Sequence, residues 1–205
     1  MAFVVLRKGR SGGCPKLKIE DAQLEIRRAY LRGGPGAIVS GLVWLASALT
    51  ASTSGVAIGF SVLFFGGMFI FPISSVIVRN VLKRPLMSKD NPGGITVIET
   101  VFPMIGGLLA AWLLMPHRPE LVFPIAAIAV GAHYFGFRTA YGDWTNWVLG
   151  GTMCLFGVAA VFSDLINTKV VPFAISAIEI VFGVWFIWQS VTRDGPQMSI
   201  ENSNG

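Results

Sequence analysis

Long apolar segments separated by short polar ones are the main pattern of this chain. Residues 33–78 contain no Asp, Glu, Lys or Arg, a stretch of 46 positions that is too long for one core helix. A membrane-crossing helix needs about 20 apolar residues, so this stretch predicts two spans and a turn. Along the whole chain the same pattern predicts six membrane-spanning helices, at about 37–50, 56–78, 95–115, 120–140, 147–162 and 170–191.

A shorter amphipathic helix is predicted before the first span, over residues 18–32. Ile19, Ala22 and Ile26 fall near one face at helical spacing. Acidic residues come early in this segment and arginines come late, which suits the helix dipole. Such a helix either lies in the membrane interface or packs on the loops of the bundle, and the sequence leaves both open. We expect Gly-Gly-Pro-Gly at 33–36 to end it.

The chain is therefore expected to be an all-α polytopic membrane helix bundle with four consecutive parts. Residues 1–17 are a basic lead that we expect to be disordered, and they are a candidate upstream extension of the true start. We do not expect this lead to be a signal peptide, because its short apolar run precedes the basic residues. Residues 18–35 hold the amphipathic helix and its break, 36–191 the six-span domain, and 192–205 a tail expected to be disordered.

Composition excludes several classes of protein. Of the 205 residues 53% are hydrophobic and 13% are charged, against about 25% charged in a soluble domain. A soluble enzyme and a disordered chain are excluded on that ground. The net charge of +5 does not indicate nucleic-acid binding, because the charges flank apolar segments and form no basic groove with interleaved aromatic residues.

The distribution of basic residues predicts how the chain is threaded. With six spans and a cytoplasmic N-terminus, fourteen of the sixteen Lys and Arg residues fall on the cytoplasmic side. Only Arg118 and Lys169 fall outside. This asymmetry follows the positive-inside rule, so we expect a multi-pass protein of the cell (inner) membrane with both termini in the cytoplasm.

Ionisable residues inside the spans are the candidate functional residues, because a charge is expensive to bury in lipid. Glu99 and His133 lie at comparable depths in the third and fourth spans, and Arg138 lies about one turn below His133. They either line a polar path or cavity, or form a structural pair, Glu99–His133 or Glu99–Arg138, that sets helix register. Glu179, near the middle of the sixth span, has no obvious partner, and its position favours a functional role.

Tyr134, Arg138 and Tyr141 share one helix face by their spacing. They form either the cytoplasmic rim of a pocket or a belt that binds lipid headgroups. Tyr134 therefore joins the candidates for the polar path or ligand cavity. Asp143 and Asp164 lie at span ends, and we expect them to be solvated.

Signatures of catalysis are not found in the sequence. It has no HExxH zinc pair, no Gly-x-Ser-x-Gly elbow and no Walker-type phosphate loop. His117 and His133 are too far apart and too poorly accompanied for a metal site. We therefore expect no catalytic residue, metal or cofactor, and an enzyme is the least favoured class.

Three segments resemble an uncharacterised family of small bacterial multi-span membrane proteins. They are Asp21–Tyr30 leading into 36–46, the stretch Phe64–Pro72, and Arg118–Leu121 followed by Gly131–Tyr134. The resemblance covers about residues 19–190 and leaves the first 17 unmatched. It implies the six-span architecture only, because this family has no function to carry over.

Two classes of function follow from the sequence. The first is a transporter-like bundle, for a small molecule or linked to protons, or a ligand-sensing bundle. The second is a non-catalytic membrane module that acts through a protein partner or as a homo-oligomer. The expected partners are the lipid bilayer, a small-molecule ligand and a second copy of the chain, and nucleic acid is not among them.

Overall fold

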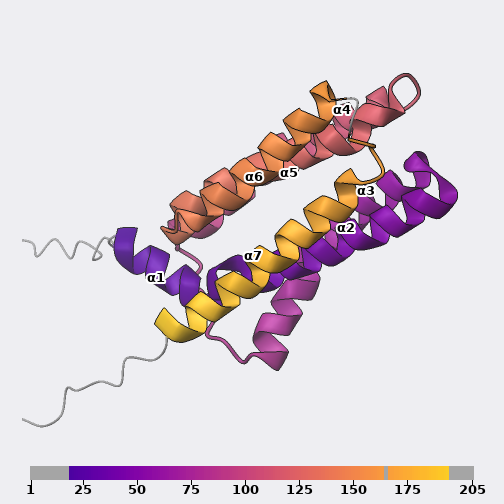
Figure 1. The fold of residues 1–205 in the computed structure, drawn as a ribbon. Helices are drawn as coiled ribbons and strands as arrows, with labels where there is room; N and C mark the ends of the chain where they lie inside the picture. The colour runs from indigo at the N-terminus through magenta and orange to yellow at the C-terminus, as the bar shows by residue number, and fades with distance from the viewer. Residues whose placement is uncertain (1–18, 164–165, 194–205) are drawn as a thin grey trace, which may run out of the picture.

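The computed structural model describes residues 19–163 and 166–193 of the chain. Within these ranges the protein is helical and has no β-strand, which confirms the predicted all-α class. The basic lead and residues 194–205 of the tail lie outside the described residues. The α-helices are α1 (Ile19–Tyr30), α2 (Gly34–Ser54), α3 (Val56–Val76), α4 (Pro92–Leu114), α5 (Val122–Tyr141), α6 (Thr145–Phe162) and α7 (Val171–Arg193) (Figure 1).

Six helical segments are long and apolar enough to cross a membrane, as the sequence predicts. The first of these segments contains α1 together with α2, and the others contain one long helix each, α3 to α7. A helix rises about 1.5 Å per residue, so 18 to 23 residues reach roughly 27–35 Å. That length matches the hydrocarbon core of a bilayer, about 30 Å thick.

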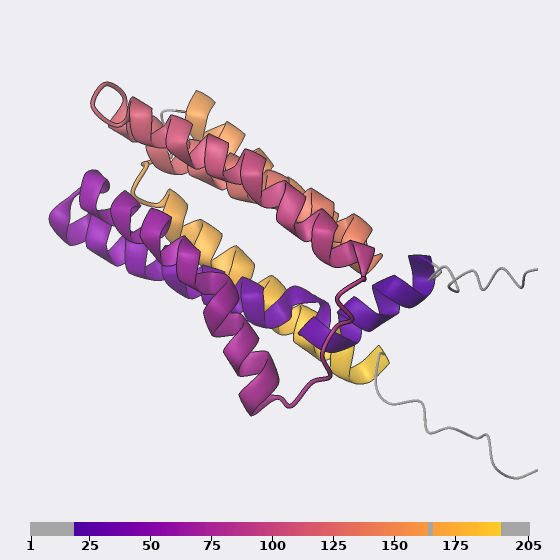
Figure 2. The ribbon, with the colours of Figure 1, turned by 180° about the vertical axis from the view of Figure 1, so that it is seen from behind.

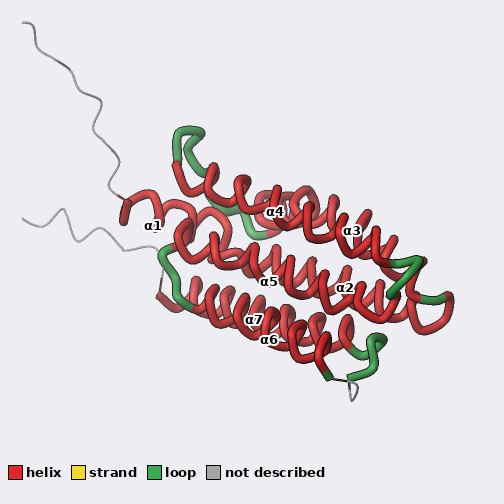
Figure 3. The backbone as a smooth tube through the Cα atoms, turned by 90° about the horizontal axis from the view of Figure 1, so that it is seen from above, coloured by secondary structure: helices red, strands yellow, loops and turns green. Residues whose placement is uncertain are grey.

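The long helices form two rows (Figures 1 and 2). In the α2 row, α2 lies between α3 and α7, and in the α5 row, α5 lies between α4 and α6. The view from above shows the six helices running roughly along one direction (Figure 3). We call the boundary between the rows the seam. The end of the bundle with α1, the start of α6 and the end of α7 is called the α1 end (Figure 1).

Close glycine contacts hold neighbouring helices together within each row. A Cβ atom added at Gly34 of α2 would lie 2.7 Å from the carbonyl oxygen of Gly183 on α7. In the α5 row, a Cβ at Gly150 of α6 would lie 2.5 Å from the carbonyl oxygen of Gly131 on α5. Small residues let membrane helices approach this closely, so each row packs backbone against backbone.

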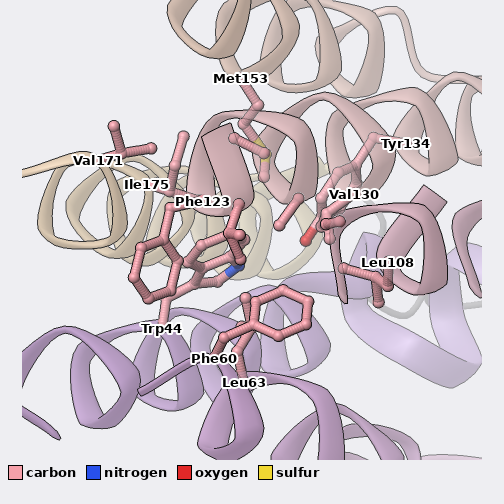
Figure 4. Packing of buried hydrophobic residues seen from close by; sticks show 14 of the residues in the cluster. Trp44, Phe60, Leu63, Leu108, Phe123, Val130, Tyr134, Met153, Val171 and Ile175 are labelled. Carbon is pink, nitrogen blue, oxygen red and sulfur yellow. The ribbon is translucent and has the colours of Figure 1, made fainter. Parts of the chain in front are cut away.

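Large apolar side chains fill the seam. Trp44 of α2 and Phe60 of α3 both pack on Phe123 of α5, with ring centroids 6.5 Å and 6.3 Å apart. Met153 and Ile175 are fully buried in the same cluster (Figure 4). The two rows therefore meet through bulky side chains, in contrast to the glycine contacts inside each row.

The break between α1 and α2 lies earlier than the sequence predicts. Residues 33–36 were expected to end the helix, yet α2 already begins at Gly34, and Pro35 lies in its first turn. Proline costs nothing there, because the first turn has no helical partner for its missing N–H. The chain turns instead at Leu31, Arg32 and Gly33, which all have positive φ, at 46°, 57° and 84°. The first span is consequently longer than the expected 37–50.

The amphipathic helix α1 packs against α5 and α4. Its side chains Ala22, Ile26 and Ala29 are buried, and Ile26 packs in a small cluster with Ala140 and Tyr141 of α5. Its apolar stripe is thus used inside the protein.

The outer helices α3 and α4 expose most of their surface. The later part of α3 bends away from the rest of the bundle (Figure 2), and Pro72 lies within this helix. A π-helical turn, Ile77–Val81, follows α3 and leads into the α3–α4 loop at 82–91. Most exposed side chains on these two helices are apolar, for example Met68, Phe102 and Leu113.

Candidate functional site

Glu179 is the most deeply buried carboxyl group among the described residues, with 0% of its surface exposed. It lies on α7 and points into the seam, where its Oε1 accepts a hydrogen bond of 2.9 Å from the hydroxyl of Tyr134 on α5. Its Oε2 is also buried and has no hydrogen-bond partner within the described ranges. A buried polar atom without a hydrogen-bond partner lowers the stability of the fold by roughly 1–3 kcal/mol. Binding of a ligand, a water molecule or a proton at this oxygen would remove that cost.

Three helices from both rows meet at this carboxyl group. Ser40 of α2 lies close to both Glu179 and Tyr134. Ser40 and Tyr134 are themselves 6% and 5% exposed. Ion pairs of the described residues do not include Glu179, so its neighbours in the seam are two hydroxyl groups and apolar side chains. We call Ser40, Tyr134 and Glu179 the seam cluster; Figure 4 shows Tyr134 within the apolar core that surrounds it.

His133 lies beside this cluster but faces α4. Its Nδ1 is 2.7 Å from Oγ1 of Thr100, and its ring packs edge-on against Phe137 with centroids 4.6 Å apart. Thr100 Oγ1 already donates to the carbonyl oxygen of Val97, and a hydroxyl has one proton to give. We infer that His133 donates through Nδ1, which makes this contact a hydrogen-bonded link between α4 and α5.

Glu99 and Arg138 do not join the other candidate residues. Glu99 is exposed on α4 and makes no hydrogen bond or ion pair with any described residue. Arg138 is exposed as well, with its guanidinium carbon 5.4 Å from the centre of the Trp147 ring. The expected Glu99–His133 and Glu99–Arg138 pairs are therefore wrong. Successive helix residues are about 100° apart, so Thr100 faces α5 and Glu99 does not.

A second polar cluster lies at the α1 end, and the sequence did not predict it. Asp143, expected to be solvated, is 6% exposed. Its Oδ2 accepts a bond of 2.6 Å from the guanidinium of Arg32, and its Oδ1 accepts bonds from Thr145 N and Oγ1 at 3.0 and 2.7 Å. The Asp143–Thr145 pair is the usual capping arrangement at a helix start, which is the one signal of it in the sequence.

The amide of Gln189 completes this α1-end cluster. In the orientation that satisfies its neighbours, its nitrogen donates to Asp143 Oδ2 at 3.2 Å and its oxygen accepts from Trp185 Nε1 at 2.9 Å. Burial raises the pKa of Asp143, but the bonds from Thr145 and Arg32 outweigh that effect and lower the pKa below its ordinary value of 3.8. Asp143 is thus a charged group that joins the turn before α2, and α7, to the turn between α5 and α6.

Further polar contacts attach α1 to the same end of the bundle. Arg27 donates to the carbonyl oxygen of Tyr141 at 2.6 Å, and Gln23 donates to that of Thr139 at 3.0 Å. Tyr141 is 5% exposed, so it belongs to this packed end and does not line an open rim with Arg138.

Asn91 and Glu25 connect α1 to the start of α4. The Oδ1 of Asn91 caps α4 by accepting from Gly93 N at 2.9 Å, and its Nδ2 donates to Glu25 Oε2 at 2.6 Å. Glu25 also accepts from Ser88 N and Oγ. Burial raises the pKa of Glu25, whereas the bonds from Ser88 and Asn91 lower it, and the net shift is downward.

The described residues contain no group of three His, Cys, Asp or Glu side chains that could hold a metal ion. Cys154 is a free thiol, and Cys14 and Asp164 lie outside the described residues. α7 runs to Arg193, two residues into the segment predicted as a tail.

Residues 19–189 match the model of a family of unknown function, DUF7010, and the chain belongs to this family. No curated protein gives a significant match to the chain. The solved structures give no significant match either. The family description carries no activity, and the membrane-bundle architecture rests on the six long apolar helices.

Proposed function

We propose that this member of the DUF7010 family is a proton-linked membrane carrier for a small solute, with Glu179 as the residue that takes up and releases the proton. The observation behind the proposal is the fully buried carboxyl group in the seam, with one oxygen that has no hydrogen-bond partner among the described residues. An ionisable residue inside the membrane points to function by default, because its placement is costly.

The packing of the two rows supports movement at this site. Glycine contacts join α2 to α7 and α5 to α6, so each row has a rigid pair of helices at its centre. The Tyr134–Glu179 bond crosses the seam between them. A charged Glu179 needs more donors than two hydroxyl groups supply, and in this proposal its ionisation separates the rows and admits water or solute.

The α1-end cluster closes the seam on one side in this proposal. Arg32 and Gln189 belong to the α2 row and its approach, and Asp143 belongs to the α5 row. Breaking these bonds opens a route from the α1 end toward Glu179, and re-forming them shuts it. The excess of Lys and Arg in segments at this end supports placing it in the cytoplasm. A reporter enzyme fused after Asn204 should then be active only in the cytoplasm, and activity outside would contradict the orientation.

The test uses purified protein and two matched variants. A panel of metabolites and ions is first screened for compounds that raise the thermal unfolding midpoint, because a ligand of the native state stabilises it. Each positive compound is then added to proteoliposomes that contain a pH-sensitive dye. We expect compound-dependent proton flux in the wild type and in Glu99→Gln, and its loss in Glu179→Gln. The amide of Glu179→Gln can still accept from Tyr134, so the variant is expected to fold.

Proton flux that is equal in Glu179→Gln and in the wild type would overturn the role of Glu179. A panel with no stabilising compound and no flux would overturn the carrier itself.

One observation favours the other class, a membrane module that acts through a partner or a second copy. Glu99 is exposed on a helix whose exposed neighbours are Ile95, Ile98 and Phe102, and a carboxylate is costly against lipid. A neighbouring chain over this face of α4 would shield it. The mass of the protein in nanodiscs tests the second copy: one chain per disc in both wild type and Glu99→Ala argues against a homo-oligomer over this face.

A further inference from the structure

A pocket of about 360 Å³ lies at the α1 end, outside both polar clusters. One wall is a face of α1 and the other is the start of the α3–α4 loop. The lining residues are Asp21, Leu24, Glu25, Arg28, Pro85 and Leu86. Neither the seam cluster nor the proposed carrier uses any of them, so the pocket needs its own explanation.

The three charged residues of the pocket are not equivalent. Glu25 is occupied, because both of its carboxylate oxygens accept bonds from Ser88 or Asn91. Asp21 makes no hydrogen bond or ion pair with the described part of the chain. The Nε of Arg28 is buried without a partner there. The pocket therefore holds one carboxylate and one guanidinium group without a hydrogen bond or ion pair to the described residues.

The spacing of these two residues places them about two helical turns apart, roughly 10 Å along the axis of α1. Asp21 and Arg28 are seven residues apart, so they share one face of α1. Long side chains on a helix lean toward its N-terminus, which carries the guanidinium of Arg28 back over the turn that holds Leu24 and Glu25. A ligand between Arg28 and Asp21 would meet a positive charge at one end and a negative charge at the other.

A simple anion does not fit this arrangement, because it would face the carboxylates of Asp21 and Glu25. A zwitterion with a phosphate and an ammonium group fits both ends. A primary ammonium suits the Asp21 carboxylate through its N–H donors, whereas quaternary ammonium groups are usually bound by aromatic cages. The lining residues include no aromatic side chain.

The surroundings of the pocket point to a membrane lipid as the source of that zwitterion. Leu86, in the pocket wall, is 68% exposed, and Val81, just before the loop, is 69% exposed. Both follow the spanning helix α3, and the loop then leads into α4 at Pro92. Exposed leucine and valine at the level where spanning helices begin are suited to contact with acyl chains. We propose that this pocket binds the phosphoethanolamine headgroup of a membrane phospholipid, with its phosphate on Arg28 and its ammonium on Asp21.

Binding of short-chain lipids to the purified full-length protein tests the proposal. Dihexanoyl phosphatidylethanolamine, phosphatidylcholine and phosphatidylglycerol are titrated in detergent and followed by native mass spectrometry, with free O-phosphoethanolamine and inorganic phosphate as further probes. We expect phosphatidylethanolamine to bind up to about fivefold more tightly than the others, since one exposed ion pair gives up to about 1 kcal/mol.

Two variants and two controls locate the site. Asp21→Asn and Arg28→Gln should each abolish the preference for phosphatidylethanolamine. Asp90→Asn and Arg79→Gln, which change exposed residues outside the pocket, should leave it unchanged. Equal binding of phosphatidylcholine would overturn the ammonium site. Equal binding of phosphatidylglycerol would overturn the zwitterion site, because it would show that the pocket attracts phosphate through its basic residue alone. Equal binding of free O-phosphoethanolamine would overturn the lipid as the ligand, and a preference that survives in Asp21→Asn would overturn the pocket.

Discussion

The guanidinium of Arg32 lies 2.6 Å from Asp143 Oδ2, although the two residues are 111 positions apart and Arg32 has a left-handed backbone, with φ at 57°. Their side chains are 11% and 6% exposed. A left-handed conformation at a residue other than glycine costs of order 1–3 kcal/mol. The turn that delivers Arg32 to Asp143 is therefore held by the contacts around it, and the ion pair is one of them.

Removing the guanidinium should destabilise the protein. Arg32→Ala leaves the buried Asp143 with Thr145 and Gln189 as its remaining donors, and we expect a loss of about 2 kcal/mol. That corresponds to a fall of roughly 4–8 °C in the thermal unfolding midpoint. Arg118→Ala is the control, because its ion pair with Glu120 is more than half exposed and exposed ion pairs contribute little to stability. Its thermal midpoint should stay close to that of the wild type. Equal falls in the midpoint of the two variants would show that the Arg32–Asp143 pair stabilises the fold no more than an exposed ion pair does.

The same carboxylate predicts how stability changes with pH. The pKa of Asp143 is lower in the folded protein than its ordinary value of 3.8, so the folded state binds its proton less readily than the unfolded state. Its stabilising effect is complete above about pH 4 and is lost as the pH falls through the lower folded pKa.

Thermal midpoints of the wild type and Asp143→Asn, measured from pH 7 to pH 3, check this prediction. We expect the wild type to lose stability relative to the variant below about pH 4. Glu25, whose pKa is lowered as well, is present in both proteins and cancels in the comparison. A difference between the two midpoints that stays constant down to pH 3 would contradict the prediction.

The six spans could be predicted from the sequence because long apolar runs have few alternatives. A segment such as 33–78, with no charged residue, can only be accommodated as membrane helices. Glu179 could be singled out for the same reason, since a charge in a span stands out against apolar neighbours. Its contact with Tyr134 was not predicted as a pair, although both residues were candidates.

The direction in which a residue faces could not be predicted in helices that are apolar all round. Glu99 and Thr100 are neighbours in α4, and their sequence context does not say which one faces α5. The Arg32–Asp143 pair could not be predicted for another reason. It depends on how two helix ends far apart in the chain are brought together. Charge near a span end is usually solvated, and only the three-dimensional contacts reveal the exception.

Two adjacent glycines of α6 give a test of the close contact inside the α5 row. A Cβ at Gly150 would lie 2.5 Å from the Gly131 carbonyl oxygen, whereas a Cβ at Gly151 would meet nothing within 4 Å. Gly150→Ala must push α5 and α6 apart, and we expect a loss of about 1–3 kcal/mol. Gly151→Ala should be neutral or slightly stabilising, because alanine loses less backbone freedom on folding. Thermal unfolding of both variants in the same detergent makes the comparison, and similar midpoints would contradict the packing.

The contribution of Asn91 to stability should come from both the oxygen and the nitrogen of its side-chain amide. Its oxygen caps α4 through Gly93 N, and its nitrogen donates to the carbonyl oxygen of Ala22 at 3.0 Å and to Glu25 at 2.6 Å. Asn91→Ala removes all three bonds, and we expect a loss of about 2 kcal/mol. Asn91→Asp keeps the cap but turns a carboxylate toward Glu25, so α1 should detach while α4 stays capped.

Hydrogen exchange separates these two variants. In Asn91→Asp the amides of α1 should exchange faster while those in the first turn of α4 keep their wild-type rates; in Asn91→Ala both should exchange faster. Ser88→Ala is a milder control, because it removes only the hydroxyl bond to Glu25 and keeps the bond from Ser88 N. Unchanged exchange of α1 in Asn91→Asp would mean that this helix is held by the burial of Ala22, Ile26 and Ala29 alone, and that the amide of Asn91 serves only as a cap.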